Sequence, residues 1–556
     1  MGRPSIGDRA LALLAAAGLL AGCAAHRAPV PSPEMDEAAF RSRVRTLTSE
    51  EFEGRRPGTP GEDKTVAYLV EQLRKLGLKP GNGASYLQPV PVTEITADRG
   101  ATLTVTGHGA TRAFAYDRDA VLWTRRPVAE TGLERSDLVF AGYGIVAPEY
   151  DWNDYAGLDV RGKTVVVLAN DPGYGSKDPK LFKGNAATYY GLWRYKAAEA
   201  ARQGAAGVLL IHDAAASGYS WEAVRNGWEG PRLVPRDAAA TPAARTAVEG
   251  WLSAAGARAL FAQAALDLDA LSAAAARPGF KAVPLGLTAD AHLRNALREF
   301  NSSNVVAWLP GAHRRNEYVL YTAHWDHLGR ADAALGGAVR QGAVDDAAGV
   351  AGLLMIARSL TRTQPPPDRS IVFIAFTAAE SGLLGSAYYV DHPVFPLRDT
   401  VAALDLDMLR IGGPTRDVAV FGFGNSEMDE FVRSAALLQG REVRPEPAPE
   451  QGWFYRSDEF SFARRGVPVV YATGGIDDSA RGPAWGRGRL EDYLANRYRQ
   501  AADRYDEDWD VRGTLDDLRL YEEVGSRLAH GRRFPRWYPQ SDYRTGRGAI
   551  ARAGED

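Results

Sequence analysis

The sequence contains almost no cysteine. Of its 556 residues only Cys23 is one, so no internal disulfide can form, even in an oxidising compartment. A GxSxG nucleophile elbow is also absent, and Cys23 lies near the N-terminus, where an export signal is expected. The sequence therefore gives little support to a catalytic serine or a catalytic cysteine.

A strong excess of either charge is absent as well. The formal net charge is -3 and the pI is about 6.4, which gives no electrostatic reason to expect nucleic acid as a partner. The chain is 45% hydrophobic and 24% charged, as soluble globular proteins are. A chain of 556 residues exceeds one ordinary hydrophobic core, so two domains are expected.

The N-terminus has the pattern of an export signal. Arg3 and Arg9 precede an apolar run over residues 10–20, which is too short to span a bilayer. The run ends in Leu-Ala-Gly-Cys, which resembles a bacterial lipobox whose Cys23 becomes the lipidated first residue of the mature protein. Ala24 follows it, which by resemblance to Gram-negative lipoproteins favours the outer membrane, facing the periplasm. We predict a signal peptide over residues 1–23 and a Pro-rich tether over residues 24–36.

Strands alternate with helices in the rest of the chain, which indicates an α/β fold with a mixed, mostly parallel sheet. The predicted strands are Asn304–Leu309, Tyr318–Thr322, Ser370–Phe376, Val401–Leu406, Val418–Phe421 and Val467–Tyr471. The predicted helices include Phe40–Phe52, Thr65–Leu76, Ala347–Leu360, Glu427–Leu438 and Leu515–His530. Between residues 138 and 282 the pattern changes, so we expect a smaller α/β domain inserted there. It would divide a larger domain made of residues 37–137 and 283–556.

Metal-type ligands stand where several of these strands end. His324, Glu380 and Asp407 each follow a predicted strand, and Asp345 precedes a predicted helix. In open α/β sheets, sites form outside the carboxyl ends of the strands. Imidazole nitrogen and carboxylate oxygen suit zinc, and one carboxylate can bridge two ions. The four residues together predict a metallohydrolase site.

Each of these residues taken alone has a purely structural explanation. Asp345 or Asp346 could cap the following helix, and His324 could be a core histidine that donates to Asp326. Glu380 could lie in a surface loop, and Asp407 could accept a hydrogen bond from a backbone amide. The shared placement at strand ends favours the metal site over these alternatives.

The segments HWDHLG, GAVDDAAGV, AAESGLLGS, LDLDM and RSDEFSFARRGVPVV resemble the zinc aminopeptidase family. This family also contains glutamate carboxypeptidase and the transferrin receptor. The resemblance implies a three-layer zinc-exopeptidase domain, and it implies that residues 138–282 form a protease-associated domain. It further implies that His324 and Asp407 bind the first metal, that Asp345 bridges two metals and that Glu380 binds the second. Asp326 would orient the site from behind the ligands.

Two positions depart from the family pattern. The resemblance implies a glutamate as general base just before Glu380, where this chain has Ala379, and a histidine as last ligand, where it has Arg499. Arginine stays protonated and offers only donors, so it cannot coordinate a cation. We expect Arg499 to reach Glu380 and Asp345 as a fixed positive charge, which leaves one zinc ion more readily than two.

Two interpretations follow from these departures. The protein is either a lipid-anchored zinc exopeptidase with a degenerate site, which removes N-terminal residues with a substitute base such as Glu459, or an inactive homologue. The inactive homologue would bind a peptide or an envelope component. Loss of a general base costs on the order of 10² to 10⁴ in rate, so hydrolysis is expected to be impaired.

Overall fold

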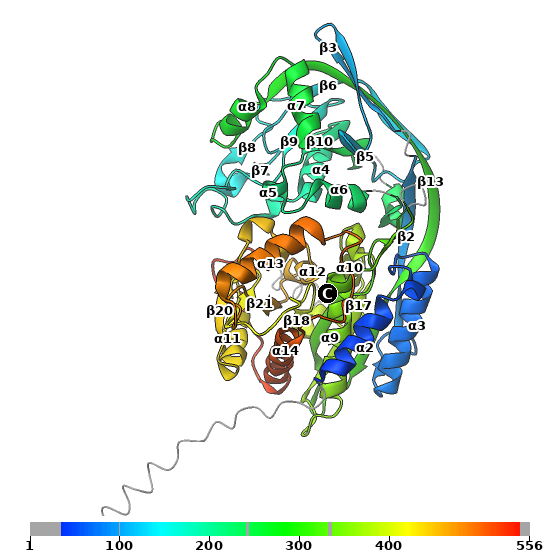
Figure 1. The fold of residues 1–556 in the computed structure, drawn as a ribbon, viewed down its shortest axis with the longest axis vertical. Helices are drawn as coiled ribbons and strands as arrows, with labels where there is room; N and C mark the ends of the chain where they lie inside the picture. The colour runs from blue at the N-terminus through cyan, green and yellow to red at the C-terminus, as the bar shows by residue number, and fades with distance from the viewer. Residues whose placement is uncertain (1–34, 99–100, 229, 241–243, 332–335, 545–556) are drawn as a thin grey trace, which may run out of the picture. The chain divides into compact units, whose positions relative to one another are not determined.

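A mixed sheet with a parallel centre organises the larger part of the chain (Figure 1). The computed structural model describes residues 35–98, 101–228, 230–240, 244–331 and 336–544. In pairing order the strands are β11 (Arg232–Pro235), β2 (Leu87–Ala97), β13 (Val283–Leu309), β17 (Arg369–Phe376), β14 (Arg314–His324), β18 (Thr400–Asp405), β21 (Val469–Gly474), β19 (Asp417–Val420) and β20 (Glu442–Pro445). Strands β17, β14, β18 and β21 run parallel to one another, and β13 and β19 flank them antiparallel. The short β1 (Lys79–Pro80) also pairs with β13.

Helices cover both faces of this sheet. One face packs against α2 (Glu37–Leu47), α3 (Pro60–Lys75), α9 (Ala348–Leu360), α11 (Met428–Leu438) and α14 (Arg512–His530). The other face packs against α10 (Leu384–Asp391) and α12 (Glu459–Ala463). A further helix, α13 (Gly482–Asn496), precedes α14. The α/β class with a mixed sheet and a helical layer on each side is therefore confirmed.

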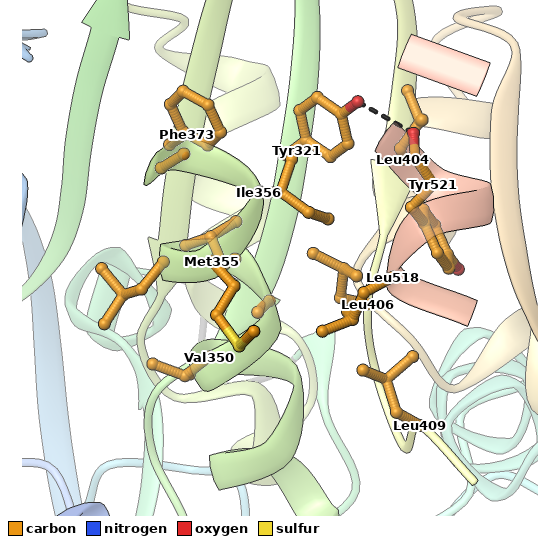
Figure 2. Close-up of a cluster of buried hydrophobic side chains, with 14 of the residues drawn as sticks. Tyr321, Val350, Met355, Ile356, Phe373, Leu404, Leu406, Leu409, Leu518 and Tyr521 are labelled. Carbon is orange, nitrogen blue, oxygen red and sulfur yellow. Dashed lines mark hydrogen bonds between the residues drawn. The ribbon is translucent and has the colours of Figure 1, made fainter. Parts of the chain in front are cut away.

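Alternation along the central strands fills both layers of the core. Tyr321 and Phe373 point towards α9 and α14, whereas their neighbours Leu320 and Val372 point to the opposite face (Figure 2). The Tyr321 hydroxyl donates to the backbone carbonyl of Tyr521 at 2.9 Å, which satisfies a buried polar group and joins α14 to the sheet. Strands buried on both faces read as continuous hydrophobic runs, which explains why the sequence predicted them.

A second sheet lies at the other end of β13. Its strands are β4 (Ala110–Phe114), β3 (Leu103–Gly107), the first half of β13, β6 (Glu130–Phe140), β9 (Thr164–Leu168), β10 (Gly207–Ile211), β12 (Val248–Leu252) and β5 (Ala120–Trp123). Its helices are α4 (Trp193–Arg202), α5 (Ala214–Ser217), α6 (Trp221–Trp228), α7 (Ala254–Gln263) and α8 (Leu268–Ala275). Two clusters of buried hydrophobic residues form its core. We call residues 101–294 the small lobe, although its strand β11 pairs with β2 of the first sheet, and the other described residues the large lobe.

The small lobe is larger than the segment 138–282 expected from the sequence. The β3–β4 hairpin precedes residue 138, and β13 pairs with β6 from Val283 to Arg294 before it pairs with β2 from Asn295. Both boundaries were misplaced because alternating, half-exposed strands lack the continuous apolar runs that mark the central sheet. Residues 34–556 form one compact unit, and the assignment of the small lobe as a protease-associated domain stays a prediction.

The predicted tether ends earlier than residue 36. The side chain of Met35 is buried in the large core, and Asp36 caps α2 by accepting a hydrogen bond from the Ala39 amide at 2.7 Å. The predicted signal peptide, Cys23 and the tether up to residue 34 lie outside the described residues. In the part of the chain that the structure describes, no helix is both long and apolar enough to cross a membrane.

Candidate metal centre

The four predicted ligands meet at the carboxyl edge of the parallel strands. His324 ends β14, Asp407 follows β18, Glu380 lies in the turn η8 (Ala379–Ser381) after β17, and Asp345 lies in the turn η7 (Ala343–Ala347) before α9. His324 Nε2 is 3.2 Å from Asp345 Oδ1 and 3.4 Å from Asp407 Oδ1. All four side chains are buried. The sequence thus predicted which residues come together.

The ligand atoms fall into two neighbouring groups. One contains His324, Asp346 and Asp407, the other His327, Asp345 and Glu380, and within each group the atoms lie within 4.8 Å of one another. Asp345 also contacts His324, so its carboxylate stands between the two groups. This is the position that a bridging carboxylate would occupy.

Asp346 has a structural role. Its Oδ1 accepts from the Gly349 amide at 3.0 Å, and its Oδ2 accepts from the His324 amide at 3.2 Å. The carboxylate therefore caps the start of α9, as the structural alternative for one of the two adjacent aspartates foresaw. Because both oxygens of Asp346 accept hydrogen bonds, we propose that Asp345 is the metal ligand and that Asp346 supports it.

His324, Asp345 and Asp407 fit zinc. Asp407 Oδ1 is buried without a hydrogen-bond partner, and it faces His324 Nε2. Burial lowers the pKa of His324, but its three carboxylate neighbours outweigh burial and raise that pKa well above its usual range. Here a carboxylate oxygen without a hydrogen-bond partner lies beside an imidazole nitrogen in a buried acidic cluster. A divalent cation could bind both atoms and offset the negative charge.

Asp326 orients this cluster. Its carboxylate accepts from the backbone amides of Ala379 at 3.0 Å and Glu380 at 3.3 Å, which fixes the turn η8. The Nδ1 of His324 donates to the backbone carbonyl of Asp326 at 3.0 Å, so Nε2 is directed at the carboxylates. The orienting role expected of Asp326 matches this geometry.

The residue before Glu380 carries no titratable side chain. Ala379 lines the cavity at the ligands with a methyl group, which cannot hold a proton. Glu459 and its neighbour Asp458 are fully buried and do not line that cavity. Burial and the nearby Asp405 carboxylate raise the pKa of Glu459 well above its usual range. Glu459 therefore faces the interior, and its suggested role as a substitute base does not fit this structure.

Arg499 contacts Glu380 directly. Its Nη2 pairs with Glu380 Oε2, whereas Asp345 acts on it only through space. The backbone carbonyl of Arg499 accepts from Asn226 Nδ2 at 3.0 Å, which joins this segment to α6 of the small lobe. Burial raises the pKa of Glu380, but Arg499 and then His327 outweigh it and hold that pKa well below its usual range.

His327 was missed in the sequence. Its Nδ1 is 3.0 Å from Glu380 Oε1, and its ring is buried in the second group of ligand atoms. The signal was present, since HWDHLG places two histidines around Asp326 directly after a strand. The second group thus holds an imidazole, two carboxylates and the guanidinium of Arg499.

A cavity of about 100 Å³ opens onto these residues. Its floor is formed by His324, Asp345, Glu380 and Asp407, and its other walls come from both lobes. A buried His and carboxylate cluster at the carboxyl edge of a three-layer α/β domain, lining a cavity, is typical of a metal-dependent hydrolase.

Comparison with known proteins agrees with that class. The model of peptidase family M28 matches residues 304–521, which include all the proposed ligands. Aminopeptidase NAALADL1 of Mus musculus is 32% identical over 142 residues, 24% of this chain and 17% of that protein. Aminopeptidase YwaD of Bacillus subtilis (strain 168) is 36% identical over 92 residues, 16% of this chain and 18% of that protein. These matches span less than a fifth of each curated relative.

A solved structure supports the fold. The aminopeptidase from Aneurinibacillus sp. strain AM-1 aligns with a TM-score of 0.53 and 19% identity over 91% of this chain and 96% of that chain. Because the identity is low, the likeness concerns the fold. Activity and substrate must be argued from the residues of this chain.

The Arg499–Glu380 pair generates a stability prediction. Arg499→Gln leaves a buried carboxylate without its strongest partner, so we expect the free energy of unfolding to fall by about 3 kcal/mol. The control is Arg497→Gln, two residues away, whose pair with Asp492 is exposed and should contribute at most about 1 kcal/mol. Urea denaturation followed by circular dichroism measures both variants. Equal losses in the two would contradict this account.

Proposed function

We propose that this protein is a zinc-dependent exopeptidase with one zinc ion and a strongly reduced rate, acting on the N-termini of peptides. The observation that carries the proposal is the buried trio His324, Asp345 and Asp407, in which one carboxylate oxygen has no protein partner. The match of residues 304–521 to the model of peptidase family M28 supports it.

These three residues would hold the zinc ion. When bound, zinc would supply Lewis-acid polarisation of the peptide carbonyl and would activate water for attack. The hydroxyl of Ser457 donates to Asp407 Oδ2, which leaves Oδ1 free to face His324. Asp326 keeps the imidazole in the required tautomer through its backbone carbonyl.

The rest of the site supports the reduced rate that we propose. Active sites of this class need a group that takes and returns a proton, and Ala379 has none, which corresponds to a loss of about 10² to 10⁴ in rate. Arg499 directs donors at Glu380 and adds positive charge to the second group, which disfavours a second cation there. His327 Nδ1 lies 3.0 Å from Oε1 of the same carboxylate, so the imidazole is close enough to pair with it.

A second candidate function is peptide binding without hydrolysis. The same two positions favour it, because Ala379 removes the base while Arg499 fills the second group with charge. In that case the cavity would retain a peptide or an envelope component. The two functions differ in whether the wild-type chain cleaves.

We further propose that the protein is lipid-anchored through Cys23 at the outer membrane and faces the periplasm. The support is the lipobox-like Leu-Ala-Gly-Cys and the following Ala24. Expression of Cys23→Ser in a Gram-negative host should release the protein from the membrane pellet into the soluble fraction. Recovery of wild type and variant in the same fraction would exclude the anchor.

Zinc content tests the metal assignment. Inductively coupled plasma mass spectrometry should find one zinc per wild-type chain and close to none in His324→Gln. His313→Gln is the control, because His313 is exposed and pairs only with Asp368 on the surface. Arg499→His should approach two zinc ions per chain. A wild-type chain that holds two ions would refute the single-ion site.

Peptide cleavage tests the activity. The full chain and the double variant Ala379→Glu, Arg499→His are incubated with zinc and a mixed peptide pool, and the products are read by mass spectrometry. We expect slow loss of N-terminal residues with the wild type, abolished by a chelator, and a gain of about 10² or more in the variant. Cleavage by the variant alone would favour the binding function.

A further inference from the structure

The cavity contains three arginines that have no acidic partner among the described residues. Arg194 lies on α4, Arg232 on β11, and Arg456 follows the turn η11 (Trp453–Tyr455). Their side chains hydrogen-bond only to backbone carbonyls: Arg194 to Tyr455 at 3.2 Å, Arg456 to Ser217 at 2.8 Å, and Arg232 to Gly227. In the same cavity Arg499 differs from them, since it is paired with Glu380.

These guanidinium groups are largely withdrawn from water. Arg456 Nη1 and Arg232 Nε are buried donors without any hydrogen-bond partner. Burial lowers the pKa of Arg194 and of Arg232 to about 10, so both stay charged at neutral pH. Buried charges are normally paired, because an isolated one costs several kcal/mol in lost hydration. Three unpaired cations around one cavity therefore call for an anion from outside the chain.

Aromatic rings fix two of the guanidinium planes. Arg456 lies 4.9 Å from the ring centre of Tyr219 and 5.2 Å from that of Trp453. Arg232 lies 5.4 Å from Trp123 and 5.6 Å from Trp228. Rings that pack on the faces of a guanidinium leave the N–H donors at its edge free to bind an oxyanion. These donors form a planar fork that matches the two oxygens of a carboxylate.

Arg194 brings this positive charge next to the metal centre. A Cβ built on Gly382 would stand 3.2 Å from Arg194 Nη1, so the guanidinium lies against the turn that carries Ala379 and Glu380. The first turn of α4 also lines the cavity, and its N-cap residue Leu192 supplies no side-chain cap. The amides of a helix N-terminus add a further partial positive charge.

The acids of the cavity do not cancel this charge. Asp345, Glu380 and Asp407 line the cavity at the metal centre, where His324 and Arg499 pair with them. Glu450 also lines the cavity, but its carboxylate accepts from Asn185 Nδ2 at 3.2 Å and makes no ion pair with the three arginines. The cavity therefore has an acidic, metal-type floor and separate basic walls.

We propose that Arg194, Arg232 and Arg456 form a subsite for the carboxylate of a short peptide, with the rest of the peptide directed towards the metal centre. The inference rests on the proposed function only in taking a peptide as the ligand. The carboxylate comes from an acidic side chain or from the C-terminus of a dipeptide. Both sources present the same two oxygens to the arginine forks.

Binding of three matched dipeptides tests the subsite and separates the two sources. Ala-Glu-amide carries only a side-chain carboxylate, Ala-Gln only a C-terminal carboxylate, and Ala-Gln-amide neither. Isothermal titration calorimetry is run on the full chain in EDTA, so that hydrolysis and zinc loading do not enter the result. We expect at least one charged dipeptide to bind about 10-fold or more tightly than Ala-Gln-amide.

Substitutions assign that preference to the arginines. Arg456→Gln and Arg194→Gln should each reduce it to within about 3-fold, while Arg112→Gln, on the exposed strand β4, should leave it unchanged. Thermal unfolding without peptide identifies any variant that misfolds, and the other variant then decides. The subsite is refuted if the three dipeptides bind equally or if the preference survives in the folded variants. Inorganic phosphate is the fourth probe, and arginine-dependent binding of phosphate alone would overturn the peptide assignment.

Discussion

Compensation of buried negative charge is the constraint on which this structure depends. The carboxyl edge of the parallel strands gathers several buried carboxylates within one hydrogen-bond network, and each one loses its hydration there. Arg55 offsets part of this negative charge through space. Its fully buried guanidinium is held in place by hydrogen bonds to the carbonyls of Trp325, Leu47, Gln341 and Gly342. Burial lowers the pKa of Arg55 to about 10, while nearby aspartates oppose that shift. The loop before α9 is thus held by a cation that never reaches solvent.

Arg499 extends the same compensation to the interface of the two lobes. Its side chain answers Glu380, and its backbone carbonyl accepts from Asn226 on α6. In a site with a metal-binding histidine at this position, the negative charge would be met by a cation from solution. Here the guanidinium of Arg499 compensates part of this negative charge. Under the proposed function the cleft therefore needs one cation from solution and not two, and Arg194 and Arg456 add further positive charge nearby.

The sequence predicted the central sheet and the cluster of side chains at its edge because both leave strong local signals. Runs of mostly apolar residues such as Ser370–Phe376 mark strands buried on both faces, and ligand types at their ends indicate a site. The predicted strand Asn304–Leu309 proved to be only the end of β13, whose first part alternates between buried and exposed residues. The direction of Glu459 and the pairing of His327 depend on packing between distant segments, which local pattern does not encode.

The long strand β13 also has a mechanical consequence. It belongs to both sheets, passing from β6 at Arg294 to β2 at Asn295 without a break in the backbone (Figure 1). Two lobes joined only by loops can swing freely, whereas a paired strand resists bending, since rotation about it would break ladder hydrogen bonds on both sides. A displacement of one lobe is therefore transmitted to the other through β13. The shared strand therefore limits how far the cleft between the lobes can widen or narrow, and with it the size of ligand that the cleft admits.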